Sequence, residues 1–115
     1  MKKVLIIDDD ETWQKVWSMR LGKRVTLLPA LSIPEAEKIF SEHTDIDLIA
    51  VDACVPGDEI NTQPLIRKIR ETFAGPMVAV SKSSFSRECL VRAGCDHESE
   101  KEWLHGKVVR ILKLI

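Results

Sequence analysis

Four short apolar runs constrain the fold of this chain more than any other feature. They are Val4–Ile7, Val25–Leu28, Leu48–Val51 and Met77–Val80. Uninterrupted apolar runs of this length are typical of strands that are buried on both faces, as in a parallel sheet. A fifth strand is predicted in the polar stretch 95–100, whose composition suits a short edge strand better than a central one.

The segments between these runs have the spacing of helices, with apolar residues recurring at intervals of three and four. Helices are predicted over Trp13–Leu21, Ser32–Phe40, Leu65–Phe73, Ser83 or Ser84 to Ala93, and Leu104–Ile115. Gly22 and Gly94 stand where residues that end a helix belong. Alternating strands and helices indicate right-handed βαβ units. We therefore expect an α/β, flavodoxin-like (βα)5 three-layer sandwich with parallel strand order 2-1-3-4-5.

Length and composition exclude several classes of protein. With 115 residues, we expect one domain over 1–115 and no output domain. A net charge of −1, from 17 Lys and Arg against 18 Asp and Glu, favours neither nucleic acid nor a membrane surface as partner. The three cysteines lack CxxC spacing, so neither a disulfide framework nor a zinc site is predicted. No apolar stretch suits a signal peptide or a membrane span, and we expect a cytoplasmic protein.

Acidic residues follow two of the apolar runs. Asp8, Asp9 and Asp10 come directly after the first run, and Asp52 after the third, while Ser81 follows the fourth. The carboxyl ends of parallel strands meet at one edge of the sheet, so Asp8, Asp9 and Asp52 are expected to face one another there. Clustered carboxylates repel unless a divalent cation bridges them, and Mg²⁺ prefers oxygen ligands. The sequence therefore predicts a magnesium site, whereas Asp10 is interpreted as a helix-start residue.

Four pieces of sequence occur in an informative order. They are Val4–Asp10, Asp47–Asp52 with Pro56-Gly57, Pro76–Ser81, and Ala93–Asp96 followed by Lys101. They resemble four parts of response-regulator receiver domains, in the same order. These parts are the first strand with its acidic pair, the strand and loop of the phosphoacceptor, the fourth strand with its terminal hydroxyl, and the segment that leads to a lysine. Each piece alone is a weak signal. Together, at this spacing, they are specific.

The resemblance implies a function in two-component phosphorelay signalling. Asp52 would accept a phosphoryl group from the phosphohistidine of a histidine kinase or phosphotransfer protein, or from a small phosphodonor, and form an acyl phosphate. Lys101 and the Ser81 hydroxyl would contact the phosphoryl oxygens. The chain would catalyse its own phosphotransfer and dephosphorylation rather than turn over a substrate, and phosphorylation would change binding to a downstream protein partner.

The resemblance also implies a set of Mg²⁺ ligands. Asp9 would bind the ion directly, and Asp8 either directly or through a water molecule. Asp52 and the backbone carbonyl of Cys54 would complete the ligands from the protein. The ion would offset negative charge on the transferring phosphoryl group, which is most of what phosphoryl-transfer catalysis requires.

The sequence departs from the receiver pattern at three places. Glu98 occupies the position of an aromatic residue that moves inward on activation; we expect it to point outward, near Lys82, because burying a carboxylate without a partner is costly. Lys101 is followed by Glu102 where a proline is usual, which puts the cis peptide bond of the family in doubt. The loop Pro56–Thr62 is about two residues longer than common.

Two alternatives remain open at the level of sequence. The segment Asp8–Thr12 fits the Asp-x-Asp-x-Thr signature of haloacid-dehalogenase-like phosphatases, with Asp8 as nucleophile. Against it, Asp52 would have no role, and no acidic pair follows Lys101 to complete that metal site. The second alternative is a receiver-like interaction module that is not phosphorylated, which Glu98 and the polar fifth strand favour.

Side chains with no assigned chemistry receive structural interpretations. Trp13 and Trp17 lie on the apolar side of the first predicted helix and are assigned to the core. Arg67, Lys68 and Arg70 of the third predicted helix are interpreted as a solvent-exposed face.

Overall fold

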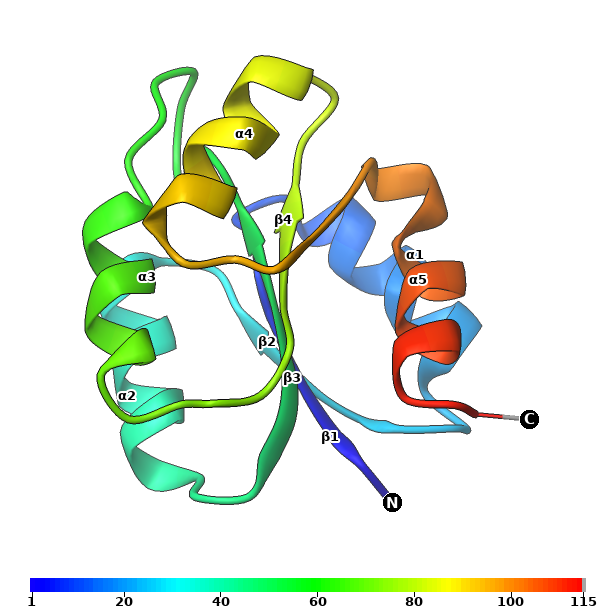
Figure 1. The fold of residues 1–115 in the computed structure, drawn as a ribbon. Helices are drawn as coiled ribbons and strands as arrows, with labels where there is room; N and C mark the ends of the chain where they lie inside the picture. The colour runs from blue at the N-terminus through cyan, green and yellow to red at the C-terminus, as the bar shows by residue number, and fades with distance from the viewer. Residues whose placement is uncertain (115) are drawn as a thin grey trace.

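The computed structural model describes residues 1–114 and contains a five-stranded parallel sheet (Figure 1). The strands are β1 (Lys3–Ile7), β2 (Thr26–Ala30), β3 (Ile46–Asp52), β4 (Met77–Val80) and β5 (His97–Ser99). Their order in the sheet is β2-β1-β3-β4-β5, and every neighbouring pair is parallel. The predicted order and the short polar edge strand are both confirmed.

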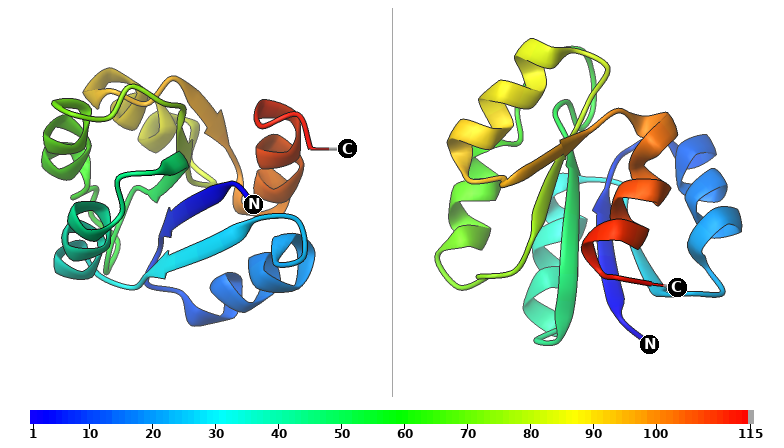
Figure 2. Two further views of the ribbon diagram at one scale, coloured as in Figure 1. Left: turned by 90° about the horizontal axis from the view of Figure 1, so that it is seen from below. Right: turned by 45° about the vertical axis from the view of Figure 1, so that its right-hand side comes forward.

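Helices cover both faces of the sheet and make the three layers that were predicted (Figure 2). They are α1 (Glu11–Leu21), α2 (Ile33–Glu42), α3 (Gln63–Arg70), α4 (Ser84–Ala93) and α5 (Leu104–Ile111), with a 3₁₀ turn η1 (Lys101–Trp103) before α5. In Figure 1, α1 and α5 lie on one side of the sheet, and α2 and α3 lie on the other. The last helix was predicted to run to Ile115 but ends at Ile111, and Ile115 itself lies outside the described residues.

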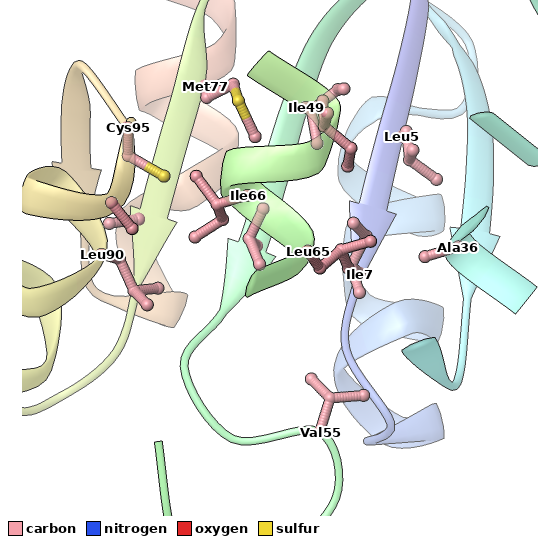
Figure 3. Close-up of a cluster of buried hydrophobic side chains, with 14 of the residues drawn as sticks. Leu5, Ile7, Ala36, Ile49, Val55, Leu65, Ile66, Met77, Leu90 and Cys95 are labelled. Carbon is pink, nitrogen blue, oxygen red and sulfur yellow. The ribbon is translucent and has the colours of Figure 1, made fainter. Parts of the chain in front are cut away.

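The two faces of the sheet explain why the strands are apolar runs rather than alternating patterns. Side chains along a strand point to opposite faces in turn. Leu5 and Ile7 pack in the core beneath α2, α3 and α4, which Figure 3 shows, whereas Val4 and Ile6 pack with Trp17 beneath α1 and α5. Both sets are buried, so no position in β1 after Lys3 faces solvent.

Local signals place the start of α2 and both ends of α4 where the sequence predicts them, whereas α3 runs from Gln63 to Arg70 and not from Leu65 to Phe73. The Ser32 Oγ accepts a hydrogen bond from the Glu35 N–H at 3.2 Å, and Ser83 caps α4 in the same way. Gly94 ends α4 with a φ of 144°, a conformation that favours glycine. Gly22 ends α1 as predicted, with a helical φ of −62° that other residues also adopt.

The second strand differs from its prediction. Val25 is buried but precedes β2, and the strand continues through Pro29 to Ala30. A proline has no N–H to donate to a neighbouring strand, so it is tolerated only where one side of the strand is free. Because β2 lies at the edge of the sheet, Pro29 fits there.

One helix side chain was interpreted wrongly from sequence. Arg70 does not belong to a solvent-exposed face: its guanidinium donates hydrogen bonds to the carbonyls of Gly94 (2.7 Å) and Gly75 (2.6 Å) and lies 3.2 Å from the Asp96 carboxylate. It thereby ties the end of α3 to the loops before β4 and β5. Arg67 and Lys68 are exposed, as predicted.

Candidate functional site

Three carboxylates meet at the carboxyl edge of the sheet. Asp8 and Asp9 follow β1, and Asp52 is the last residue of β3, the neighbouring strand. Each offers one oxygen, and these three oxygens all lie within 4.8 Å of one another. The Asp8 side chain is 1% exposed and that of Asp52 12%. The fold thus brings together the acidic residues that the sequence predicted would meet.

The two oxygens of the Asp8 carboxylate have different partners. Its Oδ1 accepts a hydrogen bond from the Asp10 N–H at 2.9 Å. Its Oδ2 is buried and faces the Lys101 ammonium, whose Nζ lies 2.9 Å away. Burying a charged oxygen without a full set of partners costs free energy. Asp8 is therefore held in place by one backbone N–H and one cation, and its oxygens are of the kind that a divalent cation prefers.

Lys101 lies between two members of the cluster, 2.9 Å from the Asp8 Oδ2 and 3.8 Å from the Asp52 Oδ2. It begins η1, and the indole N–H of Trp17 donates to the Lys101 carbonyl at 3.3 Å. Trp17 is buried in the core, as predicted, and it also positions the lysine. The Lys101–Glu102 peptide bond is trans.

The electrostatics of the cluster follow from burial and like charge. The pKa of Asp52 is raised to about 7, first by burial and then by the charge of Asp8, although Lys101 acts in the opposite direction. Burial likewise raises the pKa of Asp8. Burial alone would lower the pKa of Lys101, but its contact with Asp8 and the charge of Asp52 outweigh burial and raise it. The site therefore carries negative charge that is incompletely neutralised.

The oxygen donors fit a hard divalent cation. Asp8, Asp9 and Asp52 supply closely spaced carboxylate oxygens, and Asp8 is buried. Cys54 lies in the loop after Asp52, and burial raises the pKa of its thiol, followed by the charge of Asp52. A neutral thiol is a poor ligand for such an ion. The role of the Cys54 carbonyl as a ligand stays a prediction.

Ser81 follows β4, one residue beyond Val80, which pairs with Asp52. Its hydroxyl accepts a hydrogen bond from the Ser83 N–H at 3.1 Å, and its carbonyl accepts one from Arg87 at 2.8 Å. Among the described residues, no hydrogen bond joins Ser81 to the acidic cluster. The strand places the serine beside the cluster, whereas its predicted contact with a phosphoryl group stays a prediction.

Glu98 lies on the exposed side of β5, and its predicted partner was wrong. It pairs with Arg87, whose Nε lies 2.8 Å from the Glu98 Oε1, and not with Lys82. The same guanidinium donates to the carbonyls of Ser81 and Lys82. The Arg87 side chain starts from the first turns of α4 and reaches both the loop and the strand, and so it occupies the place expected for Lys82.

The contacts of Asp10 argue against the phosphatase alternative. Its Oδ1 accepts hydrogen bonds from the N–H groups of Thr12 (2.9 Å) and Trp13 (3.3 Å), which is the helix-capping role predicted for it. In the phosphatase signature this residue would be the acid/base, and Asp8 would be an accessible nucleophile. Instead Asp8 is buried and Asp10 caps α1.

Three polar side chains near the site have no counterpart in the sequence predictions. Gln14 donates from its Nε2 to the carbonyls of Ile6 (3.0 Å) and Asp8 (3.1 Å), and so braces the turn that carries the acidic pair. Asn61 and Thr62 contact the chain after Asp52. All three act on backbone groups, and no spacing of residue types signals such contacts.

Comparison with known proteins gives a sharp contrast between sequence and structure. No protein-family model matches the sequence, and no curated protein matches it. Solved structures match over nearly the whole chain. A two-component response regulator from Clostridium difficile has a TM-score of 0.83 and 25% identity, covering 98% of this chain and 97% of that one.

Two further structures agree. A response regulator receiver domain protein from Methanospirillum hungatei JF-1 has a TM-score of 0.80 and 19% identity, covering 98% of this chain and 91% of that one. A response regulator from Burkholderia pseudomallei, solved with a phosphorylated aspartic acid, a calcium ion and citrate, has a TM-score of 0.82 and 21% identity. The match covers 97% of this chain and 66% of that one. The chain has the fold of response-regulator receiver domains, as the sequence resemblance implied. None of the helices within residues 1–114 has the length and apolar character needed to cross a membrane.

Proposed function

We propose that this chain is a phosphorelay receiver that accepts a phosphoryl group on Asp52 in a Mg²⁺-dependent reaction. One observation carries the proposal: the Asp52 carboxylate stands at the carboxyl edge of a receiver fold, among Asp8, Asp9 and Lys101. The donor would be the phosphohistidine of a histidine kinase or phosphotransfer protein. The modified chain would bind a downstream protein differently from the unmodified one.

The chemistry assigns a separate task to each side chain. An Asp52 oxygen attacks phosphorus, the bond from phosphorus to the imidazole nitrogen breaks, and the imidazole leaves with the bonding pair, giving an acyl phosphate. When bound, Mg²⁺ would supply positive charge that favours ionised Asp52 and offsets the charge of the transferring group. Lys101, 3.8 Å from the Asp52 Oδ2, supplies a further positive charge at a phosphoryl oxygen.

The switch is proposed to begin at Ser81. Its oxygen already accepts from the Ser83 N–H, but the hydroxyl proton remains available for donation. A phosphoryl oxygen on Asp52 would accept a hydrogen bond from this hydroxyl, because β3 and β4 are neighbouring strands and Val80, the residue before Ser81, pairs with Asp52. The new hydrogen bond would favour one arrangement of the loop before α4, and this arrangement would change partner binding.

A neighbour in structure supports this chemistry at the level of the fold. The Burkholderia pseudomallei response regulator was solved with a phosphorylated aspartic acid and a calcium ion. An aspartyl phosphate and a divalent cation are thus compatible with this fold, and Mg²⁺ has the same preference for oxygen ligands.

The proposal is tested by incubating the protein with acetyl phosphate and Mg²⁺ and measuring its intact mass. Wild type should gain one phosphoryl group, Asp52→Asn none, and Asp10→Asn, which keeps a helix-capping side chain, should gain one like wild type. Modification at Asp8 would support the phosphatase alternative. A wild type that is neither phosphorylated nor altered by beryllofluoride would be the unphosphorylated interaction module.

A further inference from the structure

The loop between β3 and α3 is closed by its last two residues. The Asn61 side chain makes two hydrogen bonds to Val55: its Oδ1 accepts from the Val55 N–H at 2.8 Å, and its Nδ2 donates to the Val55 carbonyl at 2.9 Å. The Asn61 N–H donates to the Ala53 carbonyl at 3.0 Å. One residue thus satisfies backbone groups on both sides of Cys54.

Thr62 makes the second half of the closure. Its hydroxyl lies 2.9 Å from the Asp52 carbonyl and 3.2 Å from the Ala53 carbonyl, and the residue is completely buried. Thr62 immediately precedes α3, where a threonine hydroxyl would ordinarily accept a hydrogen bond from the helix. Here the side chain makes no such bond. The hydroxyl is turned toward the backbone carbonyls of Asp52 and Ala53 instead.

The segment between these contacts is anchored on the core side as well. Val55 is 1% exposed and belongs to the core beneath α2, α3 and α4 (Figure 3). Cys54 therefore lies between two peptide groups whose orientations are fixed by Asn61 and Thr62. By contrast, the loop tip from Pro56 to Glu59 is exposed, and no side-chain hydrogen bond or ion pair is found there.

We propose that Asn61 and Thr62 are positioning residues for the metal site, which hold Asp52 and the Cys54 carbonyl in place and isolate them from the exposed loop tip. The inference rests on the proposed function, because it assumes that these two groups bind Mg²⁺. A preformed arrangement lowers the cost of ordering ligands when the ion binds, and outer contacts of this kind commonly change metal affinity by about 10–100-fold. The extra length of the loop would then be confined to its tip.

The test compares Mg²⁺ affinity in matched variants by isothermal titration calorimetry. Thr62→Val removes the hydroxyl at nearly constant shape and should weaken Mg²⁺ binding about tenfold. Thr62→Ser keeps the hydroxyl and should bind within about twofold of wild type. Glu59→Gln at the tip should also bind Mg²⁺ within about twofold of wild type. Asn61→Ala, at an exposed position, provides the same test if Thr62→Val does not fold.

A purely structural role would give a different pattern. Val108→Ala, in the core beneath α5 and away from the site, serves as a control that lowers the melting temperature without changing Mg²⁺ affinity. If Thr62→Val lowers the melting temperature but binds Mg²⁺ like wild type, the inference is wrong while the proposed function stands. If wild type binds no Mg²⁺ and accepts no phosphoryl group, the proposed function itself fails.

Discussion

Replacing Asp52 by asparagine should stabilise the protein at neutral and alkaline pH in the absence of Mg²⁺. The Asp52 carboxylate is largely buried beside Asp8 and Asp9, and its pKa is raised from 3.8 to about 7. An ionised Asp52 therefore opposes folding. Asparagine has nearly the same shape and no charge, so the substitution removes the repulsion without opening a cavity.

The magnitude follows from the pKa. A rise of about three pH units, at 1.36 kcal/mol each, sets a ceiling of about 4 kcal/mol. This ceiling is already net of the 3.8 Å contact with Lys101, whose charge lowers the pKa of Asp52, and the cost of burying the asparagine amide reduces the gain further. We expect Asp52→Asn to raise the free energy of unfolding by about 1–3 kcal/mol at pH 8.

The direction in which stability changes with pH follows from the same pKa. Between the unfolded value of 3.8 and the folded value of about 7, the folded state binds more protons at Asp52 than the unfolded state does. The contribution of Asp52 to wild-type stability therefore falls as pH rises through this window. Below about pH 4 the carboxyl is protonated in both states, so the advantage of the asparagine variant should vanish there.

Urea unfolding at pH 4, 6 and 8, followed by circular dichroism, measures this directly. Asp58→Asn, on the exposed loop tip, is the matched control and should change stability by less than about 0.5 kcal/mol at every pH. An Asp52→Asn variant that is no more stable than wild type at pH 8 would refute the reasoning. A stabilisation of equal size at pH 4 would show that its cause is packing rather than charge.

Four further substitutions test the contacts of the cluster and of the neighbouring loop. Asp9→Ala should abolish the rise in melting temperature that Mg²⁺ gives wild type, since bound ligand stabilises the folded state; a normal Mg²⁺ response would exclude Asp9 as a ligand. Lys101→Met should tighten Mg²⁺ binding in titration calorimetry, because the positive charge beside Asp8 is lost. The same variant should be phosphorylated more slowly by acetyl phosphate. An unchanged Mg²⁺ affinity would contradict the expected competition between Lys101 and the ion. Glu98→Gln should lower the free energy of unfolding in urea by less than about 1 kcal/mol, because its ion pair with Arg87 is exposed. Arg87→Met should lower it by more, since the carbonyls of Ser81 and Lys82 lose their hydrogen-bond donor. Equal losses in the two variants would contradict this explanation.

Much of the fold was predictable because the strands of a parallel sheet are buried on both faces and therefore appear in the sequence as continuous apolar runs. β1, β3 and β4 are apolar runs since neither face meets solvent. β2 was placed less accurately because it is an edge strand, where Pro29 is tolerated and pattern is weaker. β5 was predicted from its length and polarity, which are the properties of a strand with one free edge.

The candidate site was predictable to the extent that its chemistry is carried by residue type. Three carboxylates and a lysine that follow strands indicate a charged site from residue type alone. The strand order then predicts that they lie close together. Asn61, Thr62 and Gln14 could not be found in this way. Their side chains bind backbone carbonyls and amides, and whether a polar residue does so depends on the path of the loop rather than on its identity.

The contacts of Ser81 show how much of the proposed switch is already in place. Its N–H donates to the Ser99 carbonyl, its own carbonyl accepts from Arg87, and its oxygen accepts from the Ser83 N–H. Only the hydroxyl proton is uncommitted. In the proposed switch this hydroxyl would donate a hydrogen bond to a phosphoryl oxygen on Asp52, and the new bond would favour one arrangement of the loop before α4. In the proposed switch, a shift of the loop would be transmitted through the Arg87 guanidinium, because Glu98 holds it from the strand side. Arg87 thus connects α4 to β5 at the position where the receiver-domain pattern has an aromatic side chain.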